Sequence, residues 1–461
     1  MDEQTVKKLR EICGENFVIE KKENVAAYLY DETEYHIRPK ANEDCVVVKP
    51  GSEEEISRIL KLANEKGRIV IPRGGGTGLC GAAIPTQPSI ILSMERFKEI
   101  VELDEANSCL TVQGGVTLGE MNEYLAKHSR LYFPCHPGDE SAHMAGLAVE
   151  NAGGARAVRH GVMRNHIRGM RIVLPTGEII KLGGKLSKDN AGYSIMQLII
   201  GSEGTLGVVT EVTLKIYPKE EHTGTLLFSF ESMKQAVDSV VEILGLGITP
   251  LAVEYMDRDI ALSAADHLGM KWPVSKGNVD IIYILSSVSE DLLYRDAEVI
   301  EEICSKYGAV ESVIAETSAE QENILKIRSN TYTSVKETIM DTLDITVPPA
   351  FIPELMEEFG KIAAKHGALI NTVGHIGDGN VHNNIYLVDG KVPEYYEEMR
   401  EELFAFAVKN GGTITGEHGI GKTRKSSMKL QFSKVELELM RKIKEVFDPK
   451  GILNPGTAIE S

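Results

Sequence analysis

A glycine-rich stretch at residues 73–81, RGGGTGLCG, constrains the possible folds more than any other part of the sequence. It directly follows a short apolar strand predicted at residues 68–72. Three of its glycines have the GxGxxG spacing of the Rossmann dinucleotide-binding loop, namely Gly76, Gly78 and Gly81. Glu95 lies near the place where that fold has its ribose-binding acid.

The residues after this loop argue against a Rossmann fold, because that motif requires a helix to begin at the loop. Residues 82–88 contain Pro85 and Pro88 and are too short for a crossover helix before the apolar strand at residues 90–92. A glycine loop of this kind still presents backbone N–H groups to an anion such as a pyrophosphate. The alternative is a tight loop with a structural role only.

Two more glycine-rich segments follow at residues 151–156 and 201–207, and the second leads into a strand predicted at residues 208–214. Residues 171–180, between them, predict a β-hairpin. Three glycine-rich loops indicate one long ligand that is held by backbone from several sides. A nucleotide fits this pattern better than a small metabolite does.

Composition narrows the function classes. The chain has 461 residues with 42% hydrophobic and 26% charged residues, which is ordinary for a globular protein of two or three domains. Its net charge of −18 argues against nucleic acid or an anionic membrane surface as a partner, so an anionic substrate needs a local cation. The N-terminus shows no apolar signal-peptide core, and no apolar run reaches the ~18 residues of a membrane span, so we expect a cytoplasmic protein.

Cysteine usage argues against a metal–thiolate cluster. The six cysteines form no CxxC pair, so neither a zinc ribbon nor an iron–sulfur cluster is indicated. We expect all of them to be buried, reduced thiols.

Beyond residues 218–221, strands alternate with helices. Strands are predicted at residues 226–230 and 281–285, and helices at 232–244, 290–307, 353–366 and 394–410. Repeated strand–helix–strand units on one sheet indicate a ferredoxin-like α+β domain.

Two histidines flank a predicted turn in GHIGDGNVHNN, residues 374–384. With residues 377–380 as the loop, Ile376 pairs with Val381 and His375 lies opposite His382. Opposed side chains roughly 5 Å apart bring two imidazoles within reach of one metal ion. The alternative is an exposed loop with two incidental histidines.

Six segments then occur in an order that resembles a known family: PRGGGTGLCG, ENAGG, GSEGTLGVVTEVTLK, HIGDGNVH, GEHGIG and DPKGILNPG. The chain resembles the FAD-linked 2-hydroxy-acid dehydrogenases of the vanillyl-alcohol-oxidase superfamily, which include D-lactate dehydrogenases, the flavin subunit of glycolate oxidase and D-2-hydroxyglutarate dehydrogenase. The resemblance implies an α+β fold with a two-subdomain FAD-binding domain at residues 1–219. A substrate cap domain would span residues 220–415, and residues 416–461 would return to the flavin.

The resemblance also implies which residues bind FAD. Residues 73–78 would cradle the pyrophosphate, and Glu203 with its neighbours would hold the adenosine end. Thr77 stands where covalent relatives often have a histidine, so the FAD should be non-covalent. The full implied set is Pro72, Arg73, Gly74, Gly75, Gly76, Thr77, Gly78, Pro137, Gly138, Asp139, Ser141, Gly146, Glu150, Asn151, Gly153, Gly154, Glu203, Thr205, Gly207, Val209 and Asn454.

For the chemistry, the resemblance implies one divalent metal ion, Fe, Zn or Mn, with His375, His382 and Glu417 as ligands. It implies His418 as the catalytic base, Arg328 as the partner of the substrate carboxylate, and Asn384 beside the substrate. The alternatives are that His418 only orients Glu417 and that Arg328 forms a surface salt bridge. Thr342 replaces a family lysine, which weakens the case for a larger diacid substrate.

The implied reaction is FAD-dependent oxidation of D-lactate to pyruvate. Residues 134–141, PCHPGDES, resemble the lactate dehydrogenase subunit of electron-bifurcating complexes, in which an electron-transferring flavoprotein couples lactate to NAD and ferredoxin. Glycolate or another D-2-hydroxy acid, with quinone as acceptor, is the first alternative. A non-catalytic electron-relay subunit and a redox-silent alkyl-glycerone-phosphate synthase are the others.

Overall fold

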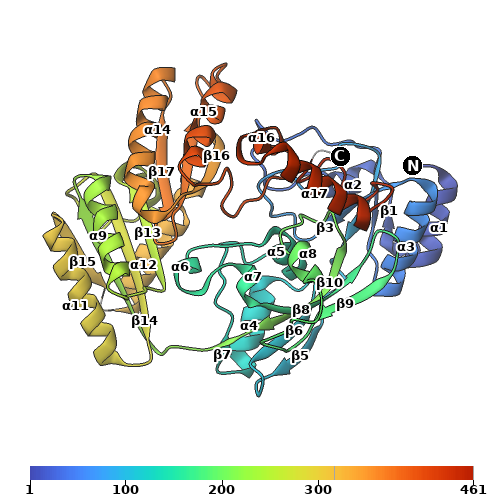
Figure 1. Cartoon of the computed structure of the whole chain (residues 1–461), viewed down its shortest axis with the longest axis horizontal. Coiled ribbons are helices and arrows are strands. Elements are labelled where there is room, and N and C mark those ends of the chain that lie inside the picture. The colour runs from blue at the N-terminus through green and yellow to red at the C-terminus, as the bar shows by residue number, and fades with distance from the viewer. Residues whose placement is uncertain (316, 460–461) are drawn as a thin grey trace. The chain divides into compact units, whose positions relative to one another are not determined.

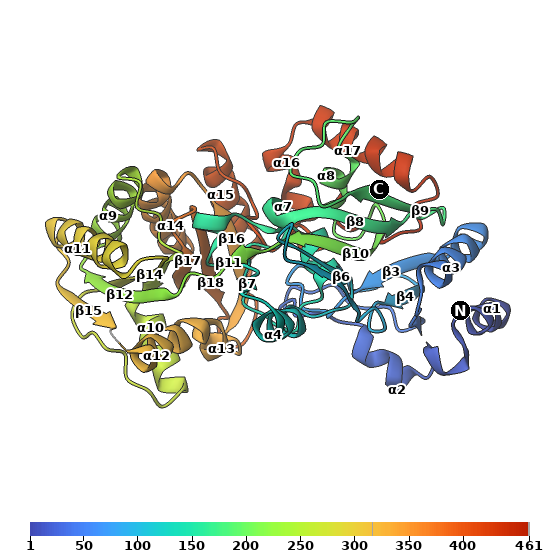
Figure 2. The same cartoon turned by 90° about the horizontal axis from the view of Figure 1, so that it is seen from below.

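A computed structural model describes residues 1–315 and 317–459 and divides the chain into two compact units (Figures 1 and 2). Unit 1 contains residues 1–152, 162–219 and 417–461, and unit 2 contains residues 153–161 and 220–416. Each unit has its own sheet system and core. Within the described residues, no helix is both long and apolar enough to cross a membrane.

The first sheet of unit 1 has the order β1-β2-β4-β3, with β1 Val18–Ile19, β2 Val46–Val48, β4 Ser89–Ser93 and β3 Ile69–Arg73. β2, β4 and β3 run parallel, and helices α1 (Glu3–Cys13) and α3 (Glu53–Lys66) contribute to its core. α3 begins at the Ser52 cap, whose hydroxyl accepts the Glu55 N–H at 3.2 Å, and ends at Gly67.

The loop between β3 and β4 contains no helix among its residues, all of which the structure describes, so the rejection of a Rossmann fold is confirmed. The outer side of β3 is covered by the C-terminal segment instead. The Val70 N–H donates to the Ile452 carbonyl at 2.8 Å, and the Asn454 N–H donates to the Val70 carbonyl at 2.9 Å. A parallel bridge between Val70 and Leu453 therefore extends this edge of the sheet.

The second sheet of unit 1 is antiparallel, with the order β5-β6-β10-β8-β9. Its strands are β5 Ile100–Asp104, β6 Cys109–Gln113, β10 Val208–Lys215, β8 Ile167–Val173 and β9 Ile179–Gly183, so the predicted hairpin at residues 171–180 is confirmed. β7 (Leu131–Tyr132) and β11 (Tyr217–Pro218) form a separate ribbon. The helices are α4 Leu118–His128, α5 Met144–Glu150, α7 Met163–His166, α8 Ile195–Ile199, α16 Met428–Gln431 and α17 Lys434–Phe447.

Unit 2 is built on one antiparallel sheet with the order β15-β12-β14-β13-β17-β18-β16. The strands are β12 His222–Phe230, β13 Ala252–Asp257, β14 Val279–Ser287, β15 Glu311–Ala315, β16 Ile339–Thr346, β17 Ile370–His375 and β18 Asn380–Tyr386. The predicted α+β fold class is confirmed, since both units combine sheets with helices.

Helices cover both faces of this sheet. Apolar residues of α10 (Arg258–His267), α12 (Ser318–Ser329) and α13 (Thr331–Val335) form one core with inward residues of the strands. α9 (Met233–Gly245) and α11 (Glu290–Lys306) lie on the other face, where Cys304 of α11 contacts Tyr283. α14 (Ile352–His366) and α15 (Tyr396–Lys409) also lie there, and α6 (Ala157–His160) packs near β13 (Figure 1).

Candidate functional site

The histidine-bearing hairpin exists as β17 and β18, but its predicted register is wrong. Val381 pairs with Gly374 rather than with Ile376, and His375 pairs with Asn380 rather than with His382. The turn consists of residues 376–379, one position earlier in the chain than expected.

Two residues explain why the turn is placed there. Ile376 is fully buried, so its side chain packs in the core, and it forms no pair in the β17–β18 ladder. Gly379 has φ 89°, and a Cβ at this position would collide with the Val347 carbonyl oxygen. Only glycine fits this end of the turn, and β18 begins at the next residue.

The corrected register keeps the two histidines on one face. His382 pairs with Val373, which lies two residues from His375, and residues two apart on a strand share a face. The two ring centroids are 5.3 Å apart and the rings are nearly perpendicular, at 86°. The side chains are 13% and 9% exposed, so the alternative of an exposed loop with incidental histidines is excluded.

Glu254 on β13 faces this pair. The ladder pairs Tyr255 with Gly374, which places Glu254 across from His375. His375 Nδ1 lies 2.7 Å from Glu254 Oε1, and the Arg328 guanidinium lies 2.6 Å from Glu254 Oε2. Burial opposes ionisation of this carboxyl, but the charges of Arg328 and His375 outweigh it and hold its pKa below the usual value.

Arg328, in the last turn of α12, thus makes a buried ion pair and not a surface salt bridge. Its side chain is 15% exposed, and that of Glu254 only 3%. Sequence reasoning missed Glu254. A signal was available, because an acidic residue interrupts the apolar run of residues 252–256, AVEYM, and a charge there needs a partner.

Asn384 lies on the same face, paired with Asn371 on β17 and with Thr342 on β16. The Thr342 hydroxyl donates to Asn384 Oδ1 at 2.9 Å, and Asn384 Nδ2 donates to Asn371 Oδ1 at 3.0 Å. Thr342 therefore orients the Asn384 amide by a hydrogen bond.

Asp344 is a second residue whose role the sequence did not reveal. It is fully buried, pairs with His382 across the ladder, and lies 3.8 Å from His382 Nδ1. Its carboxylate accepts hydrogen bonds of 2.8 Å from Asn380 Nδ2, Thr415 Oγ1 and the Gly416 N–H. This contact fixes the last residues of unit 2, immediately before Glu417 and His418, which open the final segment of unit 1.

In unit 1, the glycine loop after β3 packs against the segment that contains the other predicted FAD residues. Arg73 is 7% exposed, and its guanidinium donates to the Tyr30 carbonyl at 2.9 Å. A Cβ on Gly75 would lie 2.8 Å from the Ser141 carbonyl oxygen. Because Gly75 has no side chain, its backbone approaches that of Ser141 closely, and the buried guanidinium of Arg73 lies in the same loop. Backbone N–H groups beside a buried cation suit the pyrophosphate of FAD.

Glu203 joins the third glycine-rich segment to the C-terminal segment. Its carboxylate accepts the N–H groups of Ile420 and Gly421 at 2.8 and 2.7 Å, and Asn454 Nδ2 donates to its carbonyl at 3.0 Å. Burial raises the pKa of the Glu203 carboxyl and that of Glu150, which also faces the charge of Glu203. These contacts return residues 417–461 to the predicted flavin-binding segments.

Lys422 reinforces this closure. Its ammonium donates to the Ala82 carbonyl at 2.9 Å, to Asn454 Oδ1 at 3.2 Å and to Thr457 Oγ1 at 2.6 Å. Burial lowers the pKa of Lys422 to about 8. A buried lysine that binds backbone and amide oxygens is a structural cation at the end of the glycine loop.

The remaining predicted FAD residues lie on several elements of unit 1, except Gly153 and Gly154, which fall in unit 2. Pro72 is in β3, Gly146 in α5 and Val209 in β10, with Gly207 directly before that strand, and Asn151 is the left-handed C-cap of α5. The Thr205 hydroxyl donates to the Ser202 carbonyl at 2.7 Å. The loop of Pro137 and Gly138 is stabilised by Asp139, which accepts the Ser141 N–H at 2.8 Å.

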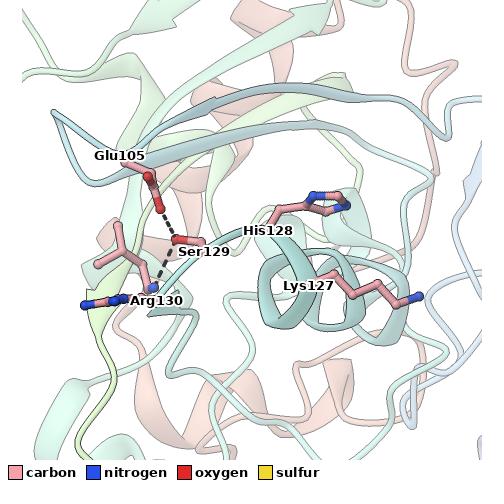
Figure 3. A pocket seen from close by; sticks show the side chains of 6 residues that line it. Glu105, Lys127, His128, Ser129 and Arg130 are labelled. Carbon is pink, nitrogen blue, oxygen red and sulfur yellow. Dashed lines mark hydrogen bonds between the residues drawn. The ribbon is translucent and has the colours of Figure 1, made fainter.

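A surface pocket at the C-terminal end of α4 does not belong to this site (Figure 3). Ser129 Oγ donates to Glu105 at 2.6 Å and accepts the Leu131 N–H at 3.0 Å. The lining contains none of the predicted site residues; it consists of Glu105, Lys127, His128, Ser129, Arg130 and Leu131.

Two family models match the chain. The model described as FAD binding domain matches residues 45–183, and the model described as FAD linked oxidases, C-terminal domain, matches residues 219–458.

Curated relatives match over most of their length. A D-lactate dehydrogenase of Archaeoglobus fulgidus is 39% identical, covering 94% of this chain and 95% of the relative. The glycolate oxidase subunit GlcD of Bacillus subtilis is 36% identical over 93% and 91%, respectively. A D-lactate dehydrogenase of Anaerostipes hadrus is 33% identical over 89% and 88%.

Solved structures confirm the fold. 4-Ethylphenol oxidase from Gulosibacter chungangensis is 17% identical with a TM-score of 0.80, and covers 99% of this chain and 96% of its own. p-Cresol methylhydroxylase is 16% identical with a TM-score of 0.78 and the same coverage. At these identities the likeness concerns the fold alone.

Proposed function

This chain belongs to the FAD-linked oxidases of the vanillyl-alcohol-oxidase superfamily, which are FAD-dependent oxidoreductases, and we propose that it oxidises D-lactate to pyruvate. The observation that carries this proposal is the cluster on one face of the unit 2 sheet. The guanidinium of the partly buried Arg328, which suits a carboxylate, contacts Glu254, and so does His375, one of the two neighbouring imidazoles. Two of the relatives are named D-lactate dehydrogenase.

FAD supplies the acceptor for the substrate hydride when it is bound. In this proposal the glycine loop and Arg73 hold its pyrophosphate. Segments around Asn151 and Glu203 line the rest of the cofactor, with Asn454 beside them. The close approach of Gly75 to the Ser141 backbone supports this arrangement, because a ligand held by main-chain groups needs such side-chain-free surfaces.

The metal ligands in this proposal are His375, His382 and Glu417. The chemistry of the donor set fits a divalent ion, because His375 directs Nδ1 to Glu254 and so leaves Nε2 for a metal. A bound divalent ion, Fe, Zn or Mn, supplies a positive charge beside the substrate hydroxyl and lowers its pKa.

The chain's own residues then bind and orient the substrate. Arg328 neutralises the carboxylate through its planar guanidinium, and Asn384, held by Thr342, directs its amide to the same face. His418 removes the hydroxyl proton at an imidazole nitrogen, since histidine is the side chain that most often serves as a general base.

A substrate panel under anaerobic conditions tests this function. D-lactate should bleach the flavin absorption band of the purified holoprotein, and bleaching should be lost after removal of divalent metal and return when it is restored. Bleaching by glycolate at a higher kcat/KM than by D-lactate would favour the second candidate, the reaction that the GlcD relatives' names indicate. No bleaching by any 2-hydroxy acid would contradict both.

We also propose that a separate electron-transferring flavoprotein accepts the electrons. The six cysteines, which the structure describes as buried free thiols, provide no iron–sulfur carrier. The glycine loop, which opens no helix, provides no Rossmann site for NAD. The purified protein with D-lactate should reduce an artificial dye but not NAD. NAD reduction without added protein would contradict the proposal.

A further inference from the structure

We propose that Glu254 is a positioning residue that couples metal binding to substrate binding, because its single carboxylate orients both the metal ligand His375 and the carboxylate-binding residue Arg328. This inference rests on the proposed function. Glu254 and the two side chains that it contacts, His375 and Arg328, all belong to unit 2.

The two oxygens of Glu254 are divided between two partners. Oε1 lies 2.7 Å from His375 Nδ1, and Oε2 lies 2.6 Å from the Arg328 guanidinium. A hydrogen bond from Nδ1–H to a carboxylate fixes the tautomer of the imidazole, leaves the Nε2 lone pair for a metal ion, and makes that nitrogen a stronger ligand.

The Glu254 carboxylate is buried, so its charge depends on the partners that it contacts. Glu254 is 2% exposed, and its ladder partner on β14 is Ile282. A buried charge is costly unless it is paired and hydrogen-bonded. Both of its partners here are predicted to serve metal or substrate, so the charge stabilises those two side chains rather than the apolar core around it.

Asp280 on β14 provides an internal comparison. It is also fully buried, and its carboxylate binds the Arg258 guanidinium at 2.6 and 2.8 Å and Trp272 Nε1 at 2.9 Å. It pairs with Met256, two residues from Glu254 on the same sheet. Its partners are not predicted site residues, so its role is confined to the fold of unit 2.

Side-chain length and charge make separate demands on Glu254. Glutamine keeps the length but removes the negative charge that both partners face. Aspartate keeps the charge but is one methylene shorter, so one carboxylate no longer reaches His375 and Arg328 at hydrogen-bond distance. If charge alone mattered, E254D would behave like the wild type.

The experiment compares E254Q, E254D and the matched control D280N as FAD-loaded proteins. Metal affinity is measured with Zn²⁺ and a competing chromophoric chelator, FAD content by absorbance and folding by thermal unfolding. The kcat and KM are measured by the steady-state reduction of an artificial dye with D-lactate at saturating metal. E254Q should bind Zn²⁺ roughly 10- to 100-fold more weakly and raise KM for D-lactate by about tenfold, with FAD content unchanged. E254D should also show weaker Zn²⁺ binding and a higher KM for D-lactate than the wild type.

D280N should lower the melting temperature while leaving the metal affinity and KM of the folded protein unchanged. Wild-type metal affinity and KM in E254Q, or an equal loss in D280N, would overturn the inference. If E254Q does not fold, E254D provides the test. Wild-type metal affinity and KM in E254D would show that simultaneous contact of one carboxylate with His375 and Arg328 is unnecessary, and would overturn the inference. A wild-type protein that bleaches with D-lactate but binds no Zn²⁺, Fe²⁺ or Mn²⁺ would contradict the metal role in the proposed function itself.

Discussion

Unit 1 and unit 2 use different parts of the chain to prepare their candidate binding groups. In unit 1 the glycine-rich loop presents backbone, and close packing such as that of Gly75 on the Ser141 carbonyl defines its shape. In unit 2 the sheet presents side chains, and the charge on Glu254 fixes their directions. Unit 1 should therefore be sensitive to added volume, and unit 2 to changed chemistry at constant volume.

The largest effect is expected from removing a side chain in unit 2. H382A should lose the metal ion and lower turnover by more than the roughly 100-fold that loss of an outer-shell partner costs, while the FAD content stays at the wild-type level. Elemental analysis, flavin absorbance and bleaching by D-lactate measure the three quantities. Loss of FAD with the metal retained would reverse the assignment of the two units.

The converse change adds one methyl group to unit 1. G75A places a Cβ 2.8 Å from a backbone oxygen, so FAD affinity should fall by about ten- to a hundredfold, the equivalent of roughly 1–3 kcal/mol of overpacking. G184A is the control, because Gly184 is a residue of unit 1 outside the predicted FAD-binding set and its Cβ would meet no atom within 4 Å. Titration of the apoproteins with FAD measures both, and equal affinities would remove the steric distinction between the units.

A charge-conserving change sharpens the comparison for unit 2. R328K keeps the positive charge but loses the planar guanidinium, so KM for D-lactate should rise roughly ten- to a hundredfold, as expected for a charge-assisted contact of about 1.5–3 kcal/mol. FAD content should not change. An unchanged KM in steady-state assays with an artificial dye as electron acceptor would place the substrate carboxylate elsewhere.

The smallest effect is expected at Lys422, which belongs to unit 1 and acts through charge. Burial lowers its pKa in the folded state to about 8 from the ordinary lysine value of 10.5, so the unfolded chain binds more protons between these values. The cost of the buried charge is present below pH 8 and is relieved as pH rises toward 10.5, and stability from this group therefore rises with pH.

Urea unfolding of the wild type and K422M at pH 7.5 and 9.5 tests this sign. The stability of the wild type should increase relative to K422M at the higher pH. K450M is the control, since Lys450 is exposed and its ammonium donates to the Asn64 carbonyl at 2.9 Å. A constant difference between the wild type and K422M would show that Lys422 does not titrate in this range.

The sequence predicted much of the fold because local signals agree with the final structure. The missing helix after the glycine loop followed from two prolines, and the hairpin followed from β-branched flanks around glycine and asparagine. The predicted register of that hairpin was wrong because of two tertiary effects. Ile376 is buried in the core, and Gly379 lies so close to the Val347 carbonyl that no side chain fits. Both effects come from distant parts of the chain. The prediction that His375 and His382 share one face was still correct, because the register error was two residues and side chains along a strand alternate with a period of two.

The sequence predicted the site residues that lie within short continuous motifs, but not those brought together from separate elements. Glu254, Arg328 and His375 lie on three separate elements, and nothing in their spacing reveals that one carboxylate serves the other two. No motif in the sequence marks Asp344, although its carboxylate accepts a hydrogen bond from Gly416, directly before Glu417. A lone acid in an apolar strand is the one local sign that would have pointed to Glu254.

The bridge between Val70 and Leu453 has a consequence for protein synthesis. The ribosome releases the β3 strand long before its edge partner Leu453, so nascent unit 1 has an open strand edge while all of residues 220–416 emerge. Unit 2 is, apart from residues 153–161, one continuous stretch and can fold during that interval. Truncation of the final residues should therefore expose β3 to aggregation, and a nascent chain stalled before Ile452 should be the species that chaperones must protect.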